Sequence, residues 1–164
     1  MSNLVDSPTA HSAQIAETLA YAKTRCQTLG VKLTAKRQKV LQVLLEANRP
    51  LSAYELVDRF QATFGTPLPA MSAYRMLTLL LDNGFVHKLE TTNQFLPCRH
   101  ICCEHQHEPP QFLICDSCHQ VKELSIGQQT LTELNNSIEK SGFILVRKQL
   151  ELHGLCQQCQ DAAL

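Results

Sequence analysis

Apolar residues recur at helical spacing in four successive stretches of the first half of the chain, each bounded by residues that start or stop helices. The first stretch ends at Gly30, which suits the left-handed position after a helix. Thr34 can cap the second stretch, and the capping box Ser52-Ala-Tyr-Glu55 opens the third. The fourth follows the linker 66–69 and closes at Gly84. The apolar positions are Ile15, Leu19, Ala22, Cys26 and Leu29; Val40, Leu41, Leu44 and Leu45; Leu56, Val57 and Phe60; and Met71, Tyr74, Leu77, Leu80 and Leu81.

Beyond Gly84 the helical period gives way to two short strand-like segments, residues 85–89 and 94–96, on either side of Thr91-Thr-Asn93. This pattern predicts a β-hairpin. Several short helices followed by a hairpin is the order of a winged helix, in which the last helix before the hairpin enters the DNA major groove. A short helical bundle with no DNA role remains the alternative explanation of the same pattern.

The second half of the chain mixes strands and one helix. Residues 112–115 and 121–124 are predicted strands, and residues 126–140 form a predicted helix with apolar residues on one side. Ile144, Val146, Leu150 and Leu152 alternate and predict one half-buried strand, with Lys148 breaking the pattern. The predicted class is therefore α+β, with a winged-helix domain at residues 1–92 and a small metal-binding dimerisation domain at residues 93–164.

Composition supports two modest cores. Of the 164 residues, 44% are hydrophobic but only 5% are aromatic, and small cores often need a metal or a partner subunit. No apolar run approaches the length that spans a membrane, and residues 1–10 lack the features of a signal peptide. We therefore expect a soluble, cytoplasmic chain whose eight cysteines are reduced and available to metals.

Net charge is zero, but basic and acidic residues are unevenly distributed. Residues 1–90 carry a net charge of +3, and residues 91–164 carry −3. Between positions 23 and 39 there are six basic residues and no acidic one. This asymmetry favours a first half that faces nucleic acid, with a solvated basic helix face as the alternative. The six residues are Lys23, Arg25, Lys32, Lys36, Arg37 and Lys39.

Two CxxC pairs in the second half predict a closed metal site. Each pair spans a tight turn, so both of its thiolates can bind one tetrahedral ion, and two pairs complete the usual structural zinc arrangement. Two redox CxxC pairs are the alternative, but a strand follows the first pair where a thioredoxin-like motif would have a helix. The four ligands are Cys115, Cys118, Cys156 and Cys159.

A second set of ligand residues converges on the same region. His87 lies on one predicted hairpin strand, Cys98 follows the other, and Glu123 lies on the strand after Cys118. With His107 as the fourth ligand, and His105 in reserve, the thiolate and imidazoles suit Zn2+ better than the cations that prefer oxygen. A single histidine is more often structural, and Cys26 on its apolar stripe is expected to be a core residue.

Several motifs together make the chain resemble the ferric uptake regulator family of metal-dependent repressors, and within it the zinc uptake regulator branch. The resemblance runs from about residue 15 to residue 160. The motifs are Leu33-Thr-Ala-Lys-Arg37, Leu51-Ser-Ala-Tyr-Glu55, Ala73-Tyr-Arg75, Gly84-Phe-Val-His-Lys88, Cys115-Asp-Ser-Cys118 and His153-Gly-Leu-Cys156-x-x-Cys159.

The resemblance implies a homodimer with N-terminal winged helices and C-terminal dimerisation domains. It also implies two zinc ions in each subunit. One would be structural, on the two CxxC pairs, and one regulatory, on a His-Cys-His-Glu set that corresponds to His87, Cys98, His107 and Glu123. The third of these ligands falls in a loop of variable length, which leaves His105 as the other choice.

For DNA, the resemblance suggests that Tyr54 and Arg75 approach base edges. Tyr74, Ser72, Lys36 and Arg37 would lie near the backbone. An Arg suits guanine and basic residues suit phosphates, although Tyr54 and Arg75 could equally be solvated helix residues. Two departures stand out: Ser72-Ala73 replaces the Thr-Val common before Tyr-Arg, and His119 occupies a turn position that Gly fills more easily.

These features predict a zinc-responsive repressor of zinc-uptake genes that binds double-stranded operator DNA and is not an enzyme. No membrane or small-molecule substrate is expected. Three alternatives remain: a sister repressor that senses another metal or peroxide, a zinc hydrolase with Glu123 as base, and a zinc-stapled interaction module with no DNA role. A hydrolase would need an open metal position, which four protein ligands would exclude.

Overall fold

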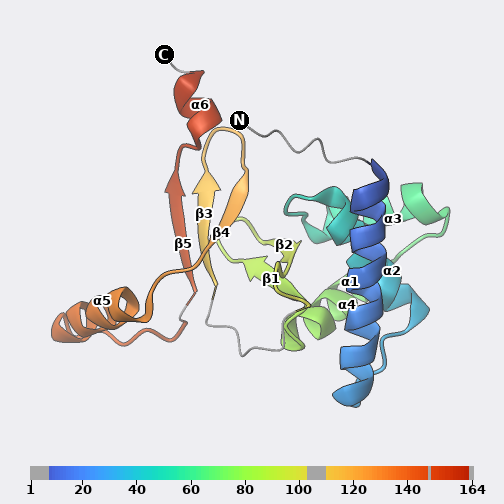
Figure 1. Ribbon diagram of the computed structural model, residues 1–164, viewed down its shortest axis with the longest axis horizontal. Helices are drawn as coiled ribbons and strands as arrows, with labels where there is room; N and C mark the ends of the chain where they lie inside the picture. Colours follow the sequence, from blue (N-terminus) through green and yellow to red (C-terminus); the bar gives the residue numbers. More distant parts are fainter. Residues whose placement is uncertain (1–7, 103–109, 148, 163–164) are drawn as a thin grey trace. The chain divides into compact units, whose positions relative to one another are not determined.

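The computed structural model describes residues 8–102, 110–147 and 149–162. The chain forms two compact units, Met1–Glu104 and His105–Leu164 (Figure 1). The sequence-based boundary at residue 92 would have assigned the second hairpin strand to the C-terminal domain. In the structure this strand pairs with β1 inside the unit Met1–Glu104, and its Phe95 lies in the core of that unit. No helix among the described residues is long and apolar enough to cross a membrane.

Four helices build the first unit: α1 (Pro8–Thr28), α2 (Ala35–Ala47), α3 (Ala53–Phe64) and α4 (Ala70–Asp82). The predicted caps are present. The Thr34 hydroxyl accepts the backbone N–H of Arg37 at the start of α2. At the start of α3, Ser52 and Glu55 form both hydrogen bonds of a capping box. These caps satisfy backbone donors that a helix leaves without partners at its first turn, so they fix where α2 and α3 begin.

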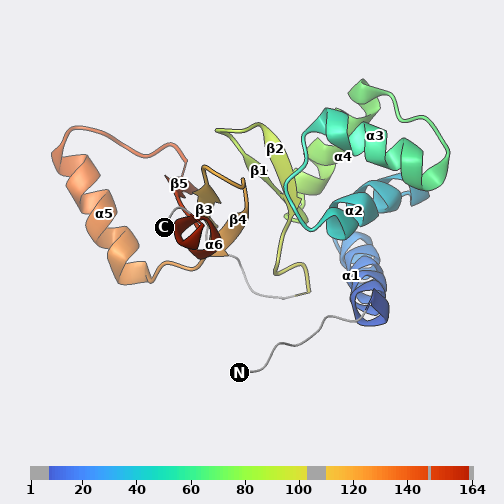
Figure 2. The ribbon, with the colours of Figure 1, turned by 90° about the horizontal axis from the view of Figure 1, so that it is seen from above.

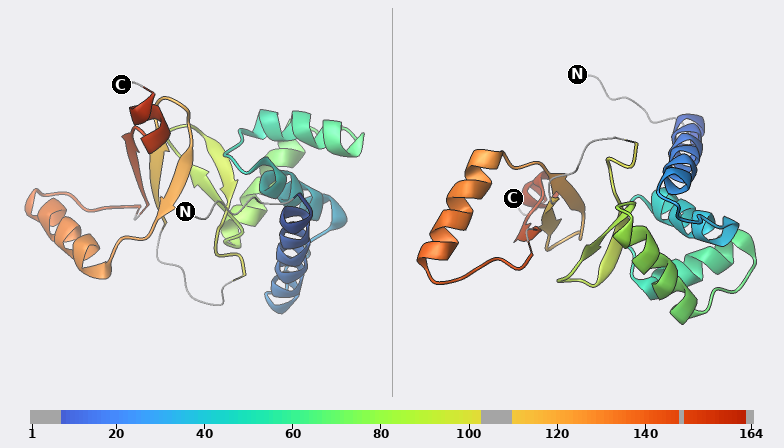
Figure 3. Two further views of the ribbon diagram at one scale, coloured as in Figure 1. Left: turned by 45° about the horizontal axis from the view of Figure 1, so that its top comes forward. Right: turned by 90° about the horizontal axis from the view of Figure 1, so that it is seen from below.

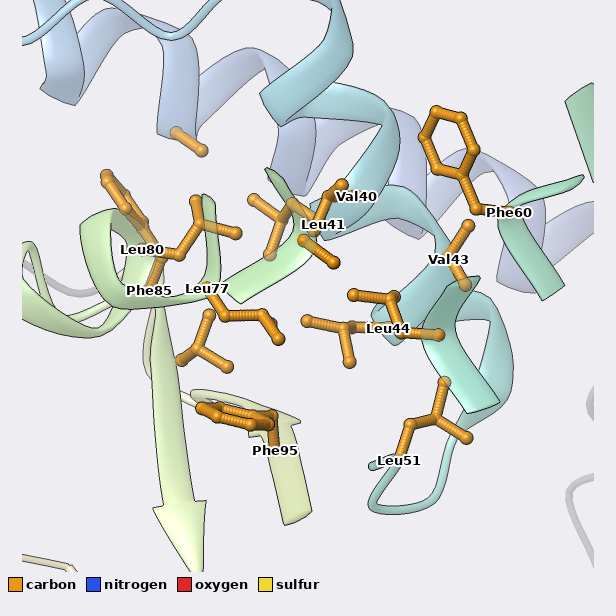
Figure 4. Close-up of a cluster of buried hydrophobic side chains, with 14 of the residues drawn as sticks. Val40, Leu41, Val43, Leu44, Leu51, Phe60, Leu77, Leu80, Phe85 and Phe95 are labelled. Atoms are coloured by element: carbon orange, nitrogen blue, oxygen red, sulfur yellow. The ribbon is translucent and has the colours of Figure 1, made fainter. Parts of the chain in front are cut away.

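The hairpin that follows α4 completes the winged helix. Its strands, β1 (Val86–Leu89) and β2 (Gln94–Pro97), pair antiparallel, and Leu51 bridges to Phe95 ahead of α3. Figure 4 shows side chains of α2, among them Leu41 and Leu44, gathered with those of α4 and the hairpin. The hairpin therefore shares one core with the helices. Figure 2 shows β1 and β2 beside α2 and α4 from a second direction.

The apolar stripe predicted for the first helix holds except at its last position. Ile15, Leu19, Ala22 and Cys26 are buried as expected, but Leu29 is 52% exposed. The helix ends at Thr28, and Gly30 follows with a φ of 68°. Leu29 therefore lies past the last helical residue, where the chain turns away and the apolar stripe no longer continues.

The second unit is built around a three-stranded sheet with the order β4-β3-β5 (Figure 3). The strands are β3 (Gln111–Cys115), β4 (Val121–Leu124) and β5 (Leu150–Gly154). β3 pairs antiparallel with β4 and parallel with β5. The buried Gln111 side chain accepts the backbone N–H of Leu150 at 2.7 Å, which fixes the start of the parallel pair.

The last predicted strand is wrong in its first half. Ile144 and Val146 are 84% and 95% exposed, and β5 begins only at Leu150. Alternation alone does not make a strand when no neighbouring backbone is available to pair with it. Two helices complete the unit: α5 (Gln128–Lys140), which was predicted and has no buried residue, and the short α6 (Gln157–Asp161), which was not predicted.

Candidate metal centres and nucleic-acid interface

The parallel pairing of β3 with β5 brings the two CxxC turns together. Cys115 lies opposite Gly154 at the end of the ladder, and the Asp116 N–H donates to the Gly154 carbonyl at 2.9 Å. One turn follows β3 and the other follows β5, so both leave the same end of the sheet. The ligand atoms of all four cysteines lie within 4.8 Å of one another. The four residues are Cys115, Cys118, Cys156 and Cys159.

Hydrogen bonds favour the thiolate form of one cysteine in this cluster. Backbone N–H groups of Cys118 and Cys156, in that order of effect, lower the pKa of the Cys115 thiol to about 6. The donor on Cys156 lies 3.3 Å from the Cys115 sulfur. The Gln120 N–H lowers the pKa of Cys118, but the neighbouring thiols outweigh it and raise that pKa to about 12. One thiolate is thus favoured at neutral pH, and its proximity opposes ionisation of the next.

Zinc fits the arrangement. A tetrahedral ion with Zn–S bonds of about 2.3 Å sets its sulfurs about 3.8 Å apart. The sulfurs of Cys118 and Cys156 are 3.6 Å apart, and the whole set is within 4.8 Å. Four protein thiolates leave no ligand position for water or substrate, so the site suits a structural zinc and not a catalytic one.

His119, which stands where the family pattern usually has glycine, adopts a left-handed backbone conformation. His119 adopts a φ of 59°, the left-handed region that glycine reaches without strain. Its N–H donates to the Cys115 carbonyl at 2.9 Å, which closes the turn around the first cysteine pair. The sequence expectation for this residue is confirmed: a histidine occupies a turn that favours glycine.

Two members of the second ligand set lie on one face of the hairpin. His87 on β1 is opposite Leu96 on β2. Cys98 is two residues beyond Leu96, and its N–H donates to the Phe85 carbonyl at 2.9 Å, so pairing continues past the end of β2. Residues two apart on a strand share a face, as do residues opposite each other. The side chains of His87 and Cys98 therefore project from the same side.

Of the other residues in this second ligand set, the structure describes only Glu123. Glu123 lies on β4 of the second unit, opposite Phe112 on β3, and is half-buried. His105 and His107 lie outside the described residues. The hairpin register thus places His87 and Cys98 on one face, and the ligand set as a whole stays a prediction.

The predicted recognition helix, α4, is amphipathic. Ala73, Leu77 and Leu80 are buried on its inner side. Met71, Arg75 and Thr78 are exposed, at the spacing of one helix face. Ser72 and Tyr74 are half-buried at its margins. The alternative explanation of Arg75, a charge that only faces solvent, fits this geometry as well as DNA binding does.

The remaining predicted DNA contacts lie on α2 and α3. Tyr54, on the first turn of α3, is 67% exposed. Lys36 and Arg37 are half-buried on the first turn of α2, and a guanidinium nitrogen of Arg37 donates to the Lys32 carbonyl. From the sequence, Met71 was only one of the apolar positions of the fourth predicted helix. The periodicity did not predict that its side chain is 68% exposed.

The comparisons with known proteins decide the family. The sequence signature described as the Ferric uptake regulator family matches residues 28–153. The chain belongs to this family. It is 36% identical over 145 residues to the Zinc uptake regulation protein of Escherichia coli (strain K12), an alignment that covers 88% of this chain and 82% of that relative. It is also 30% identical over 151 residues to the Ferric uptake regulation protein of Synechococcus elongatus, covering 87% of this chain and 95% of the relative.

Solved structures agree on the fold. A zinc uptake regulator complexed with zinc and DNA matches with a TM-score of 0.78 at 32% identity, covering 91% of this chain and 97% of that chain. The holo form of XcZur matches with a TM-score of 0.72 at 35% identity, covering 88% and 98%. The α+β architecture with an N-terminal winged helix is therefore that of the ferric uptake regulator family, as the motifs predicted.

Proposed function

We propose that this member of the ferric uptake regulator family is a zinc-responsive DNA-binding repressor that controls zinc-uptake genes in the cytoplasm. The observation that carries the proposal is Cys98, which shares a hairpin face with His87 in a chain that resembles zinc uptake regulators over most of its length. A thiolate beside an imidazole is a donor set that favours zinc over cations that prefer oxygen ligands.

Two zinc ions per subunit follow from the donor sets. The four cysteines would hold a structural ion. His87, Cys98, Glu123 and His107, with His105 as the other candidate, would hold a regulatory ion, which supplies a link among these ligands when bound. Because His87 and Glu123 belong to different units, ligation restricts how the two units move. Arrangements that fit DNA are then favoured, and coupling of about 1–3 kcal/mol is typical of such linkage.

The surfaces support a homodimer on operator DNA. The second unit exposes large apolar side chains that a second copy would cover, and α5 has no buried residue of its own. Figures 1 and 2 show α5 standing away from the sheet, with no element of its unit packed around it. The exposed apolar residues include Leu113, Phe143, Ile144, Val146 and Leu152. In the first unit, exposed Arg75 on α4 is available to base edges, and basic residues of α2 are available to phosphates.

Other functions are less well supported. The relatives that match across most of the chain are regulators by name, and the chain is accordingly a regulator and not a hydrolase. Iron- and peroxide-responsive relatives also match, the latter at 24% identity over 136 residues. Cys98 and the similarity to zinc uptake regulators are therefore what favours zinc as the sensed metal.

The test is a zinc titration of DNA binding by the full chain, using duplexes that the zinc-loaded protein selects from a random library. We expect affinity to rise as zinc fills the regulatory site, and Cys98→Ser and Glu123→Gln to abolish the rise while the structural zinc stays bound. Cys102→Ser is the matched control, because Cys102 is an exposed thiol outside both ligand sets. His105→Ala and His107→Ala, made separately, identify the fourth ligand. Equal DNA affinity with and without regulatory zinc would refute the proposal.

A further inference from the structure

Met71 is exposed at a position where a large apolar side chain gains little from the fold. It lies on the first turn of α4 and is 68% exposed, whereas Ala73, Leu77 and Leu80 of the same helix are buried. Among the described residues of the first unit, the large exposed hydrophobic residues are Leu29, Tyr54 and Met71. Met71 alone of these lies on the helix that precedes the hairpin.

Met71 shares the outer face of α4 with Arg75. The two residues are four positions apart, so their side chains are neighbours, and Thr78 continues the face. No acidic residue occurs on α4 before Asp82, its last residue, so the exposed face can approach phosphates without repulsion. Helical side chains lean toward the N-terminus, which carries the Met71 thioether to the leading end of the helix.

The chemistry of the major groove offers one apolar feature that such a side chain can read. Each base pair presents hydrogen-bonding groups there, and thymine adds its 5-methyl group. A methionine side chain is flexible and polarisable, which suits contact with a methyl group. Recognition helices present their N-terminal residues to base edges. Four residues of helix span about 6 Å, the rise of about two base pairs at 3.4 Å each.

We propose that Met71 is a specificity residue that contacts the 5-methyl group of a thymine within about two base pairs of the base read by Arg75. This inference rests on the proposed function, because it requires that α4 enter the major groove. It adds a contact that discriminates thymine from cytosine at a defined distance from the Arg75 contact, and it assigns a role to a residue that lies outside the buried core.

A methyl deletion in the DNA tests the contact directly. The probe is a duplex selected from a random library by the zinc-loaded full chain, in which each thymine is replaced in turn by deoxyuridine. Loss of one buried methyl group weakens binding by about 3- to 5-fold. We expect the wild-type protein to show this loss at one thymine per half-site, and Met71→Ala to weaken binding to the unmodified duplex by a similar factor while becoming insensitive to that replacement.

Two further variants distinguish the loss of the thymine contact from a loss of protein stability. Met71→Leu keeps an apolar side chain and is expected to retain the thymine preference, whereas Met71→Gln keeps the length and is expected to lose it. Thermal unfolding of all three variants is expected to match the wild type, because the side chain is exposed. Thymine-to-deoxyuridine ratios that are the same for wild type and Met71→Ala at every position would overturn the inference alone. Failure of the wild type to select any duplex would overturn the proposed function as well.

Discussion

Nδ1 of His153 lies 2.8 Å from Oδ1 of Asp116, which joins the turn after β3 to the strand that leads into the second cysteine pair. Asp116 directly follows Cys115, His153 lies three residues before Cys156, and the Asp116 N–H also donates to the Gly154 carbonyl. The pair therefore orients the two CxxC turns relative to each other. Groups that orient ligands in this way commonly change metal affinity by about 10- to 100-fold when they are removed.

We therefore expect Asp116→Ala to release the structural zinc to a chelator about 10-fold faster than the wild type. The rate can be followed with a colorimetric zinc indicator under conditions that leave the regulatory site empty. Glu139→Gln, an exposed acid on α5, is the control and is expected to leave the rate unchanged. An Asp116→Ala protein that keeps the wild-type release rate would show that the contact between Asp116 and His153 does not hold the turns.

The capping box at α3 gives a prediction about pH. The Ser52 N–H donates to the Glu55 carboxylate at 2.8 Å, and this bond, helped by Arg49 at 2.9 Å, lowers the pKa of Glu55 from 4.5 to about 2. A lowered folded-state pKa stabilises the protein above the unfolded-state value of 4.5, and the stabilisation is lost as the pH falls from there toward 2. Because the carboxylate is partly exposed, we expect about 1 kcal/mol and not the full value of the shift.

Glu55→Ala is therefore expected to lower the free energy of unfolding by about 1 kcal/mol at pH 7 and by much less at pH 2.5. Urea unfolding of variant and wild type in parallel at each pH isolates this difference from other titrating groups. Asp58→Ala, an exposed acid further along α3, is expected to show a smaller and flatter difference. A destabilisation by Glu55→Ala that does not change with pH would contradict the assignment.

The left-handed backbone of His119 can be relieved by substitution. We expect His119→Gly to raise the free energy of unfolding by about 0.5–1 kcal/mol, because glycine adopts a φ of 59° without strain but also gains entropy in the unfolded chain. His119→Val is expected to be destabilising, since a β-branched residue tolerates this region poorly. Thermal unfolding of the zinc-loaded proteins measures both, and the opposite order of stability would be inconsistent with strain at this turn.

The four-cysteine cluster predicts the consequence of removing one ligand. Cys118→Ser is expected to reduce the zinc content of the purified protein by one ion per chain and to unfold the second unit at a lower temperature, because structural zinc contributes directly to folding. Elemental analysis and thermal unfolding measure the two effects. Cys26→Ala tests a buried thiol outside the cluster, and it is expected to leave the zinc content unchanged.

The sequence predicted the elements whose signals are local. The caps at Thr34 and Ser52 define helix starts through bonds between residues three apart, and both were found as predicted. The CxxC pairs are likewise local, and the sheet brings them together. Ile144 and Val146 show where local pattern fails, since a strand forms only if a neighbouring strand pairs with it. The exposure of Met71 also depends on which side of α4 faces the core, and apolar character alone does not reveal it.

The parallel ladder between β3 and β5 has a consequence for how the chain folds. The Gln111 side chain bonds to Leu150, which lies 39 residues later, so a long loop closes before this ladder gains any hydrogen bond. The first unit also closes a long-range bridge, between Leu51 and Phe95, but most of its contacts join elements that follow one another in the chain. We expect the N-terminal unit to fold first during synthesis. The C-terminal unit is expected to fold only after its two CxxC turns, which are far apart in the sequence, have come together. In a cell short of zinc, chains would then accumulate in which the first unit is folded and the second unit is not yet folded.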